Sequence, residues 1–203
     1  RLLACCDGPL RSIVEIAVRT GMRRSEVVKL RWRDVDLRRG IITLHETKNG
    51  ERRDIPMSER VTQVFRMLAE DKQSEYVFPG ESPEGHIGES YVTHRFARAL
   101  KKAGIDDFRF HDLRHTFASW LVMRGVDLKT VQELLGHKTF AMTLRYSHLS
   151  PEHRRQAVSV LDRVGPSVEP AEEARKESNR HFSATGSTPV LLQDYANLLV
   201  QKH

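Results

Sequence analysis

The spacing of apolar residues changes twice along this chain of 203 residues. From Ile13 to Val18 and again from Val27 to Leu30 the apolar residues follow the period of a buried helix, as they do in several segments after Val61. Between Val35 and Pro56 they form short alternating runs instead, interrupted by the pair Asn49-Gly50, which is typical of a tight hairpin. The sequence therefore predicts a mixed α+β fold, mainly α-helical, with a small three-stranded antiparallel sheet.

Start and stop residues mark the helices expected near the end of this pattern. His111 begins a helix that Gly125 ends, and Asp127 is the expected N-cap of a helix that ends at Gly136. A further short helix, which Thr139 can cap, is expected to carry Tyr146.

Cysteine usage and apolar content indicate the compartment. The two cysteines, Cys5 and Cys6, are adjacent, and neighbouring cysteines do not easily reach disulfide geometry. No apolar run approaches the roughly 20 residues that a membrane helix needs. A cytoplasmic protein without a membrane partner is expected.

The net charge of +6 is unevenly distributed. Residues 1–164 carry 29 basic and 22 acidic side chains, whereas residues 165–203 carry four and five. A basic body favours a polyanionic partner such as nucleic acid, although a mixed-sign surface with a modest basic excess also occurs without one.

The end of the chain differs from the body. Gly165 to Thr188 is polar and has no core-forming spacing, so it is interpreted as a linker. Leu191 to Leu199 forms an apolar stripe on a helix too short to be stable alone, which must dock on this body or on a neighbour. The chain starts at Arg1 inside an apolar pattern, which suggests a fragment of a longer polypeptide.

Tyr146 lies nine residues after His137, and basic side chains elsewhere in the chain can make its phenol a nucleophile toward a phosphodiester. Moving a phosphodiester onto a protein hydroxyl places growing negative charge on phosphorus. Arginine suits the non-bridging oxygens because it presents forked donors and stays charged, whereas lysine can give up a proton. Arginine is therefore expected to clamp the phosphate and lysine to protonate the leaving oxygen.

Several spaced motifs, taken together and in this order, resemble the catalytic signatures of the tyrosine recombinases, also called phage integrases. They are Thr20-Gly-Met-Arg23-Arg-Ser-Glu26, Lys48 at a strand-turn tip, His111-Asp-Leu-Arg114-His115, Leu135-Gly-His137 and Tyr146. The resemblance covers about Arg1 to Leu161, and motifs in order are more specific than any one of them.

The resemblance implies a mechanism without metal or nucleotide cofactor. Tyr146 would attack the scissile phosphate, form a 3′-phosphotyrosyl link and release a 5′-hydroxyl, and a second strand would later reverse the step. By resemblance, Arg23 and Arg114 clamp the phosphate, and Lys48 is the general acid for the leaving oxygen. His111 is a general base or acid near the tyrosine, and His137 donates a hydrogen bond to the phosphate. Glu26 helps to organise the site.

Each of these residues also has an ordinary structural interpretation. Lys48 can simply solubilise a turn, and Arg52 and Arg53 beside it are expected to contact the DNA backbone. The i, i+4 spacing of His111 and His115 could hold zinc, but no third ligand stands at a suitable spacing, so His115 is expected to pack or hydrogen-bond inside its helix segment. A basic stretch either follows the DNA backbone or forms a solvated helix face: Arg95, Arg98, Lys101, Lys102 and Arg109.

The resemblance thus implies a site-specific DNA recombinase domain over residues 1–164, acting on double-stranded DNA and of bacterial or phage origin. It also implies an upstream domain that closes a clamp on DNA, and a C-terminal helix exchanged between protomers of a tetramer. Two alternatives stay open: a DNA-binding regulator on the same fold that does not cleave, and a type IB topoisomerase that religates the same strand.

Overall fold

The computed structural model describes residues 1–45, 52–81, 85–149 and 158–159. The chain divides into two compact units, Arg1–His153 and Arg154–His203, and every element named below lies in the first unit. The helices are α1 Leu2–Cys5, α2 Pro9–Thr20, α3 Arg24–Val28, α4 Glu59–Ala69, α5 Glu89–Ala103, α6 Asp112–Met123, α7 Leu128–Leu135 and α8 Ala141–Leu144. The strands are β1 Val35–Asp36, β2 Ile41–Leu44 and β3 Arg53–Pro56, and two 3₁₀ turns are η1 Trp32–Asp34 and η2 Ser147–Leu149.

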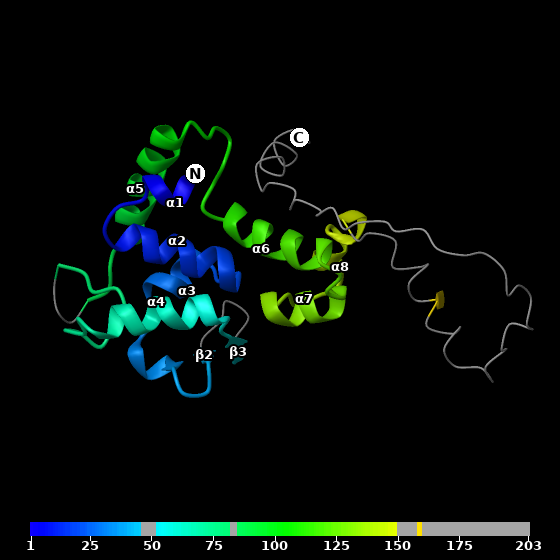
Figure 1. Ribbon diagram of the computed structural model, residues 1–203, viewed down its shortest axis with the longest axis horizontal. Helices are drawn as coiled ribbons and strands as arrows, with labels where there is room; N and C mark the ends of the chain where they lie inside the picture. Colours follow the sequence, from blue (N-terminus) through cyan, green and yellow to red (C-terminus); the bar gives the residue numbers. More distant parts are fainter. Residues whose placement is uncertain (46–51, 82–84, 150–157, 160–203) are drawn as a thin grey trace, which may run out of the picture. The chain divides into compact units, whose positions relative to one another are not determined.

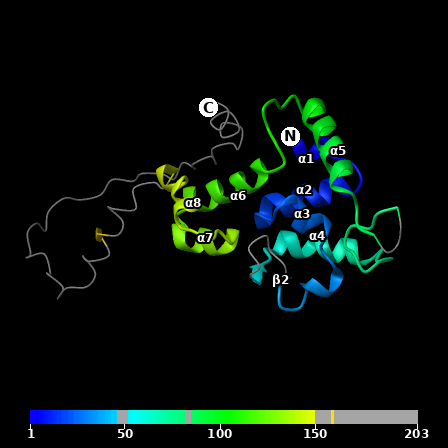
Figure 2. The same ribbon diagram turned by 180° about the vertical axis from the view of Figure 1, so that it is seen from behind.

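Helix α2 is the central element of the first unit. It starts with Pro9 at its first position and ends at Gly21, whose φ of +67° is the left-handed conformation that closes a helix. Almost every residue between them is buried, and α2 contacts α1, α3, α4, α5 and α6 (Figures 1 and 2). A helix buried on nearly all sides needs apolar residues in every direction, which explains the continuous apolar block seen in the sequence.

The three strands form one antiparallel sheet in the order β1-β2-β3, which confirms the predicted fold class. Ile42 of β2 pairs with Ile55 of β3, and both are buried. Their neighbours Thr43 and Asp54 also pair, and the Thr43 hydroxyl donates a hydrogen bond to the Asp54 carboxylate at 2.8 Å. The hairpin tip, including Asn49-Gly50 and Lys48, lies outside the described residues.

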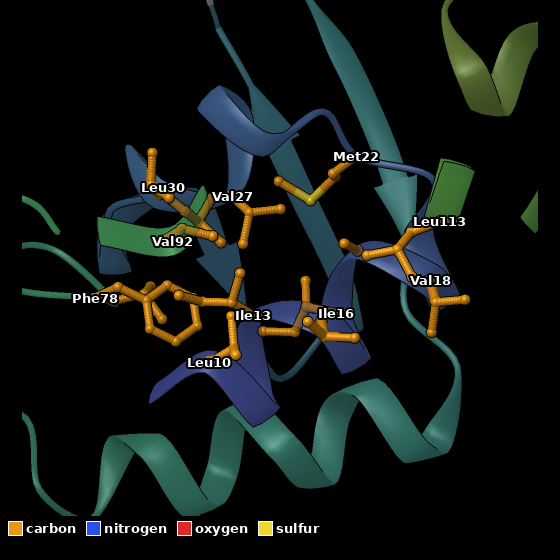
Figure 3. Packing of buried hydrophobic residues seen from close by; sticks show 14 of the residues in the cluster. Leu10, Ile13, Ile16, Val18, Met22, Val27, Leu30, Phe78, Val92 and Leu113 are labelled. Atoms are coloured by element: carbon orange, nitrogen blue, oxygen red, sulfur yellow. The ribbon is translucent and has the colours of Figure 1, made fainter. Parts of the chain in front are cut away.

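Two groups of buried side chains stabilise the unit. The larger group joins α2 to its neighbours, and Figure 3 shows Ile13 and Ile16 of α2 packed near Met22, Val27 and Leu113. The smaller group is built from α6, α7 and the segment that follows α8. Its buried members are Phe117, Ala118, Val122, Val131, Leu135 and Tyr146. Tyr146 is therefore a core residue of the region that α6 and α7 form.

The ends of α7 agree with the predicted caps, but the tyrosine segment does not. The Asp127 carboxylate accepts a hydrogen bond from the Thr130 amide at 2.8 Å, and Gly136 ends the helix at φ +61°. Helix α8 begins after Phe140 rather than after Thr139, and it stops before Tyr146. The prediction of a helix carrying Tyr146 was thus wrong, because the chain turns between α8 and η2 so that the phenol packs inward.

Helix α3 starts at Arg24 and contains Val27 and Val28 of the predicted apolar run. The predicted linker and terminal helix, Gly165 to Leu199, lie outside the described residues. Among the helices within the described ranges, none has both the length and the apolar composition needed to cross a bilayer.

Candidate active site

Glu26 holds two arginines at the start of α3. Its Oε2 accepts hydrogen bonds from the Arg23 amide at 2.8 Å and from Nη2 of Arg53 at 2.9 Å, and its Oε1 accepts one from Nη1 of Arg23 at 2.8 Å. The side chains of Glu26 and Arg53 are each 7% exposed, so these charge-assisted bonds are shielded from water. Glu26 therefore organises the start of α3 and fixes the positions of both guanidinium groups.

Arg114 lies deeper, on α6, and is almost fully buried. Its Nη1 donates to the Gly21 carbonyl at 2.7 Å, and its Nη2 donates to the Leu135 carbonyl. Burial first, and then the positive charges of Arg23 and Arg53, lower the pKa of Arg114 to about 9. Arg114 still carries its charge near neutral pH, and it connects the C-terminal ends of α2 and α7, where helix dipoles favour a cation.

Arg53 requires a correction. The sequence assigned it, with Arg52, to contact with the DNA backbone, yet Arg53 is buried and its Nη1 donates to the Leu135 carbonyl that also binds Arg114. A side chain enclosed in this way has no surface to offer a duplex. The cause is the alternation of β3, because Arg53 is in phase with buried Ile55 and faces inward with it. We call these three arginines the arginine cluster: Arg23 and Arg53, which bind Glu26, and Arg114, which shares the Leu135 carbonyl with Arg53.

Tyr146 lies in the turn after α8 and is 4% exposed. Its Oη is 2.5 Å from Nδ1 of His115, a hydrogen bond between side chains 31 positions apart. Burial raises the pKa of Tyr146, and the positive charges of Arg145 and Arg114 oppose that rise. The phenol is consequently protonated near neutral pH and needs a proton acceptor before it can act as a strong nucleophile.

His111 and His115 lie on one side of α6, with ring centroids 4.9 Å apart and planes 85° to each other. Burial lowers the pKa of both; the next largest cause is the charge of Arg114 for His111, and His111 itself for His115. The expectation that His115 packs or hydrogen-bonds inside its own helix segment was wrong, because its hydrogen bond goes to Tyr146, 31 positions away. Its i, i+4 spacing from His111 was the available signal that both rings share one face.

His137 immediately follows the glycine that ends α7. Its Nδ1 is 2.9 Å from Oγ1 of Thr143, a fully buried residue of α8. Burial, followed by the charges of Arg114 and Arg23, lowers the pKa of His137 to about 4. The imidazole is therefore neutral at neutral pH, and an anion placed beside it would raise that pKa again.

The tyrosine, the three histidines and the arginines interact electrostatically, as expected of side chains that share one site. Arg23 and Arg114 act on His137, and Arg114 also acts on Tyr146. Arg145, which the sequence predictions left out, acts on Tyr146 and on all three histidines. The carboxylates that partly offset these charges are Glu26, bonded within the arginine cluster, and Asp112, which raises the pKa of His111 and His115. The excess of cations suits a bound oxyanion.

The remaining predicted residues lie elsewhere. Lys48 is outside the described residues. Arg52 is exposed and stands 3.4 Å from Asp54, and Arg95 stands 3.0 Å from Asp7. Four further basic residues are exposed on α5 or before α6: Arg98, Lys101, Lys102 and Arg109. Within the described ranges, no side-chain hydrogen bond or ion pair links any of these residues to the arginine cluster.

A zinc site at His111 and His115 would need a third metal-binding side chain nearby. Within residues 1–45, 52–81, 85–149 and 158–159, no three His, Cys, Asp or Glu side chains form a group able to hold a metal ion. The pair His111 and His115 stands without a third ligand of that kind in this part of the chain.

The site therefore joins three chemical capacities. It has a protonated phenol, a neutral imidazole in hydrogen-bond contact with it, and guanidinium groups that can stabilise negative charge on an oxyanion. This combination suits nucleophilic substitution at a phosphate or a similar centre, because a base can activate the phenol while fixed cations meet the developing charge.

Comparison with known proteins gives one consistent family. The sequence pattern described as "Phage integrase family" matches residues 1–153. The integrase of Salmonella phage P22 is 34% identical over 180 residues, which are 83% of this chain and 46% of that protein. Tyrosine recombinase XerC of Xanthomonas campestris pv. campestris is 36% identical over 155 residues, which are 72% of this chain and 48% of that protein.

A solved structure gives the same result for the fold. The catalytic domain of bacteriophage HP1 integrase superimposes with a TM-score of 0.61 at 33% identity, over 85% of this chain and 94% of that domain. The chain spans about half the length of the curated relatives it matches. With most of its length matched by the family pattern and by both relatives, the chain belongs to the phage integrase family of tyrosine recombinases.

Proposed function

We propose that this chain is the catalytic domain of a site-specific DNA recombinase, which breaks and rejoins DNA strands through a 3′-phosphotyrosyl intermediate on Tyr146. The observation that carries the proposal is the placement of the buried phenol against His115, within the field of Arg114 and Arg145. A protein that only bound DNA would have no physical need for a nucleophile held beside a proton acceptor and several cations.

The reaction divides among the side chains as follows. Tyr146 Oη forms a bond to phosphorus, and the bond from phosphorus to the 5′ oxygen breaks. Arg23 and Arg114 stabilise the non-bridging oxygens, with Arg23 as the more accessible of the two at 21% side-chain exposure. His137 donates a further hydrogen bond to the phosphate. The negative charge of the bound phosphate would raise the pKa of the imidazole, and a protonated imidazole is a better hydrogen-bond donor.

The leaving oxygen needs a proton, and we assign its delivery to Lys48 on the ground of its motif. Because one phosphodiester is exchanged for another, bond energy is conserved and no nucleotide cofactor is required. Rejoining runs the same steps in reverse, with a 5′-hydroxyl attacking the phosphotyrosyl bond and Tyr146 leaving.

The proposal extends to domains and partners. We place the catalytic domain at residues 1–164 and give residues 165–203 the role of a linker and an exchangeable helix in a DNA-bound tetramer. Double-stranded DNA fits the basic excess of the body, which carries 29 basic against 22 acidic residues. The assembly is tested by light scattering, which gives the oligomeric state of the DNA-bound protein with and without residues 165–203. An unchanged oligomeric state after truncation would show that residues 165–203 do not assemble the tetramer.

The direct test of the proposed function is covalent trapping. The chain is incubated with a pool of nicked duplexes of randomised sequence. After cleavage, the short 5′-hydroxyl strand between the cleavage site and the nick dissociates, so rejoining is prevented and the covalent adduct accumulates. An adduct at Tyr146 in the native chain, absent from Tyr146→Phe, supports the proposal. DNA binding without any adduct would indicate a regulator, and relaxation of plasmids that lack the recovered sequence would indicate a topoisomerase.

A further inference from the structure

The phenol of Tyr146 has one hydrogen-bond partner in the described part of the chain, and it is His115. The two atoms, Oη and Nδ1, are 2.5 Å apart, and the ring centroids are 6.0 Å apart with planes at 48°. A pair this close allows direct transfer of a proton along the hydrogen bond.

His111 occupies a different position. Its ring stands edge-on to His115 at 4.9 Å, and in the described residues no hydrogen bond joins it to Tyr146. The family resemblance assigned His111 the role of a general base or acid near the tyrosine, but here His115 holds the hydrogen bond to Oη of Tyr146. Proton removal by His111 would require the phenol to leave its present partner.

The charges around His115 determine where the proton rests before reaction. The groups that face it are His111 at the N-cap of α6, Asp112 and Arg114 of α6, Arg145 and Tyr146 from the segment after α8, and His137 from the connection after α7. Burial and the neighbouring positive groups lower the pKa of His115, while burial raises that of Tyr146. At neutral pH the phenol and the imidazole are therefore both uncharged. With the ring hydrogen on Nε2, the phenol donates its hydrogen bond to Nδ1, the arrangement that proton transfer to His115 requires.

Resting on the function proposed above, we propose that His115 is a catalytic residue: it accepts the Tyr146 proton as the phosphotyrosyl bond forms and returns it when that bond is broken. In cleavage the Oη–H bond breaks and Nδ1 gains the proton, Oη bonds to phosphorus, and the 5′ oxygen leaves with a proton from Lys48. In rejoining the 5′-hydroxyl gives its proton to Lys48, and protonated His115 returns its own to the departing phenol oxygen. Protons and charge balance in both directions.

A purely structural role for His115, holding the phenol in place, makes a different prediction. The variant His115→Gln distinguishes the structural role from the catalytic role, because the glutamine side chain still offers a hydrogen-bond acceptor but cannot take up a proton. If His115 only positions Tyr146, the glutamine variant should react nearly as fast as the native chain.

The first measurement needs no DNA and is independent of the proposed function. Nitrogen-15 NMR of histidine-labelled protein reports which ring nitrogen carries hydrogen, and Tyr146→Phe identifies the His115 signals. A bare Nδ1 and a protonated Nε2 at pH 7 are expected. A hydrogen on Nδ1 would mean that the phenol oxygen is the acceptor, and the proposal would be overturned.

The second measurement follows adduct formation on the recovered DNA against pH, with an ordinary 5′ oxygen and with sulfur in its place. A thiolate leaves without needing a proton, so sulfur should restore a Lys48→Ala variant. We expect His115→Gln to react about 100-fold more slowly on both substrates and to lose the fall in rate at acid pH, as removal of a general base predicts. The exposed His148→Gln is the matched control and should keep the native rate.

The possible failures are distinct. A native chain that forms no adduct defeats the proposed function and this inference together. A native chain that forms the adduct while His115→Gln keeps its rate and acid limb defeats the inference alone. Rescue of His115→Gln by sulfur would assign it to the leaving group instead and would likewise overturn the proposal.

Discussion

Gly136 and Arg53 approach so closely that a Cβ atom on the glycine would lie 2.6 Å from Nη1 of the arginine and 2.9 Å from its Cδ. The same glycine has a φ of +61°, which residues with side chains rarely adopt. It therefore ends α7 and also leaves room for the guanidinium that binds Glu26 and the Leu135 carbonyl. This contact ties β3 to the end of α7, next to His137.

Replacing Gly136 by alanine should destabilise the protein through both the backbone and the contact. Gly40→Ala is the matched control, because Gly40 has φ +68° with nothing within 4 Å of an added Cβ. We expect the control to lose about 1 kcal/mol of unfolding free energy from the left-handed conformation alone. Gly136→Ala should lose about 3 kcal/mol, because Arg53 must also give up buried hydrogen bonds. Urea denaturation measures both, and equal losses would show that the approach to Arg53 carries no cost.

Arg53→Met and Arg52→Met form a second matched pair on neighbouring residues. Removing Arg53 leaves the buried carboxylate of Glu26 with one guanidinium partner fewer, and loss of one member of a buried ion pair costs about 3 to 5 kcal/mol. Arg52 and Asp54 are both largely exposed, so Arg52→Met should change the unfolding free energy by less than about 0.5 kcal/mol. A similar change for both variants in urea denaturation would contradict the buried role of Arg53.

Local signals in the sequence were enough to predict most of the helices and strands. The cap Asp127 and the stop Gly136 act within a single helix, and the alternation around Ile42 and Ile55 depends only on neighbouring strands, so each could be predicted from spacing. The prediction of a helix carrying Tyr146 was wrong because packing against α6 and α7, rather than helix propensity, determines where that segment turns.

The unpredicted parts of the site depend on contacts between distant segments. Arg53 and the Leu135 carbonyl are 82 positions apart, and His115 and Tyr146 are 31 positions apart. No local pattern states that β3 and the end of α7 meet, or that α6 presents a second histidine to the turn after α8. The inward phase of Arg53 was detectable from its two-residue spacing to Ile55, but charge favoured the surface interpretation.

Chelation gives a prediction about cofactors. We expect adduct formation to proceed at an unchanged rate in excess EDTA and without added nucleotide, because Arg23, Arg114 and the histidines supply the cationic and proton-transfer groups that the step needs. The measurement is the adduct yield with and without chelator on the same DNA. Loss of the adduct in EDTA, restored by added zinc, would revive the interpretation of His111 and His115 as metal ligands.

The low pKa of His137 predicts how stability changes with pH. In the unfolded chain this histidine takes up a proton near its ordinary pKa of about 6.5, whereas in the folded protein it does so only near 4. Between these values the unfolded state binds more protons, so the contribution of His137 to stability is fully present above pH 6.5 and is lost as pH falls toward 4. The partly exposed ring reduces the effect to about 2 kcal/mol.

The variant His137→Gln should remove that part of the pH dependence. Urea denaturation at pH 7.5 and at pH 4.5 is expected to show a smaller difference in unfolding free energy for His137→Gln than for the native chain. His148→Gln, at an exposed position two residues after Tyr146, should keep the native difference. If both variants lose it equally, the charges of Arg114 and Arg23 do not act on His137, and its place beside the arginine cluster would have to be abandoned, because close guanidinium groups must disfavour a protonated imidazole.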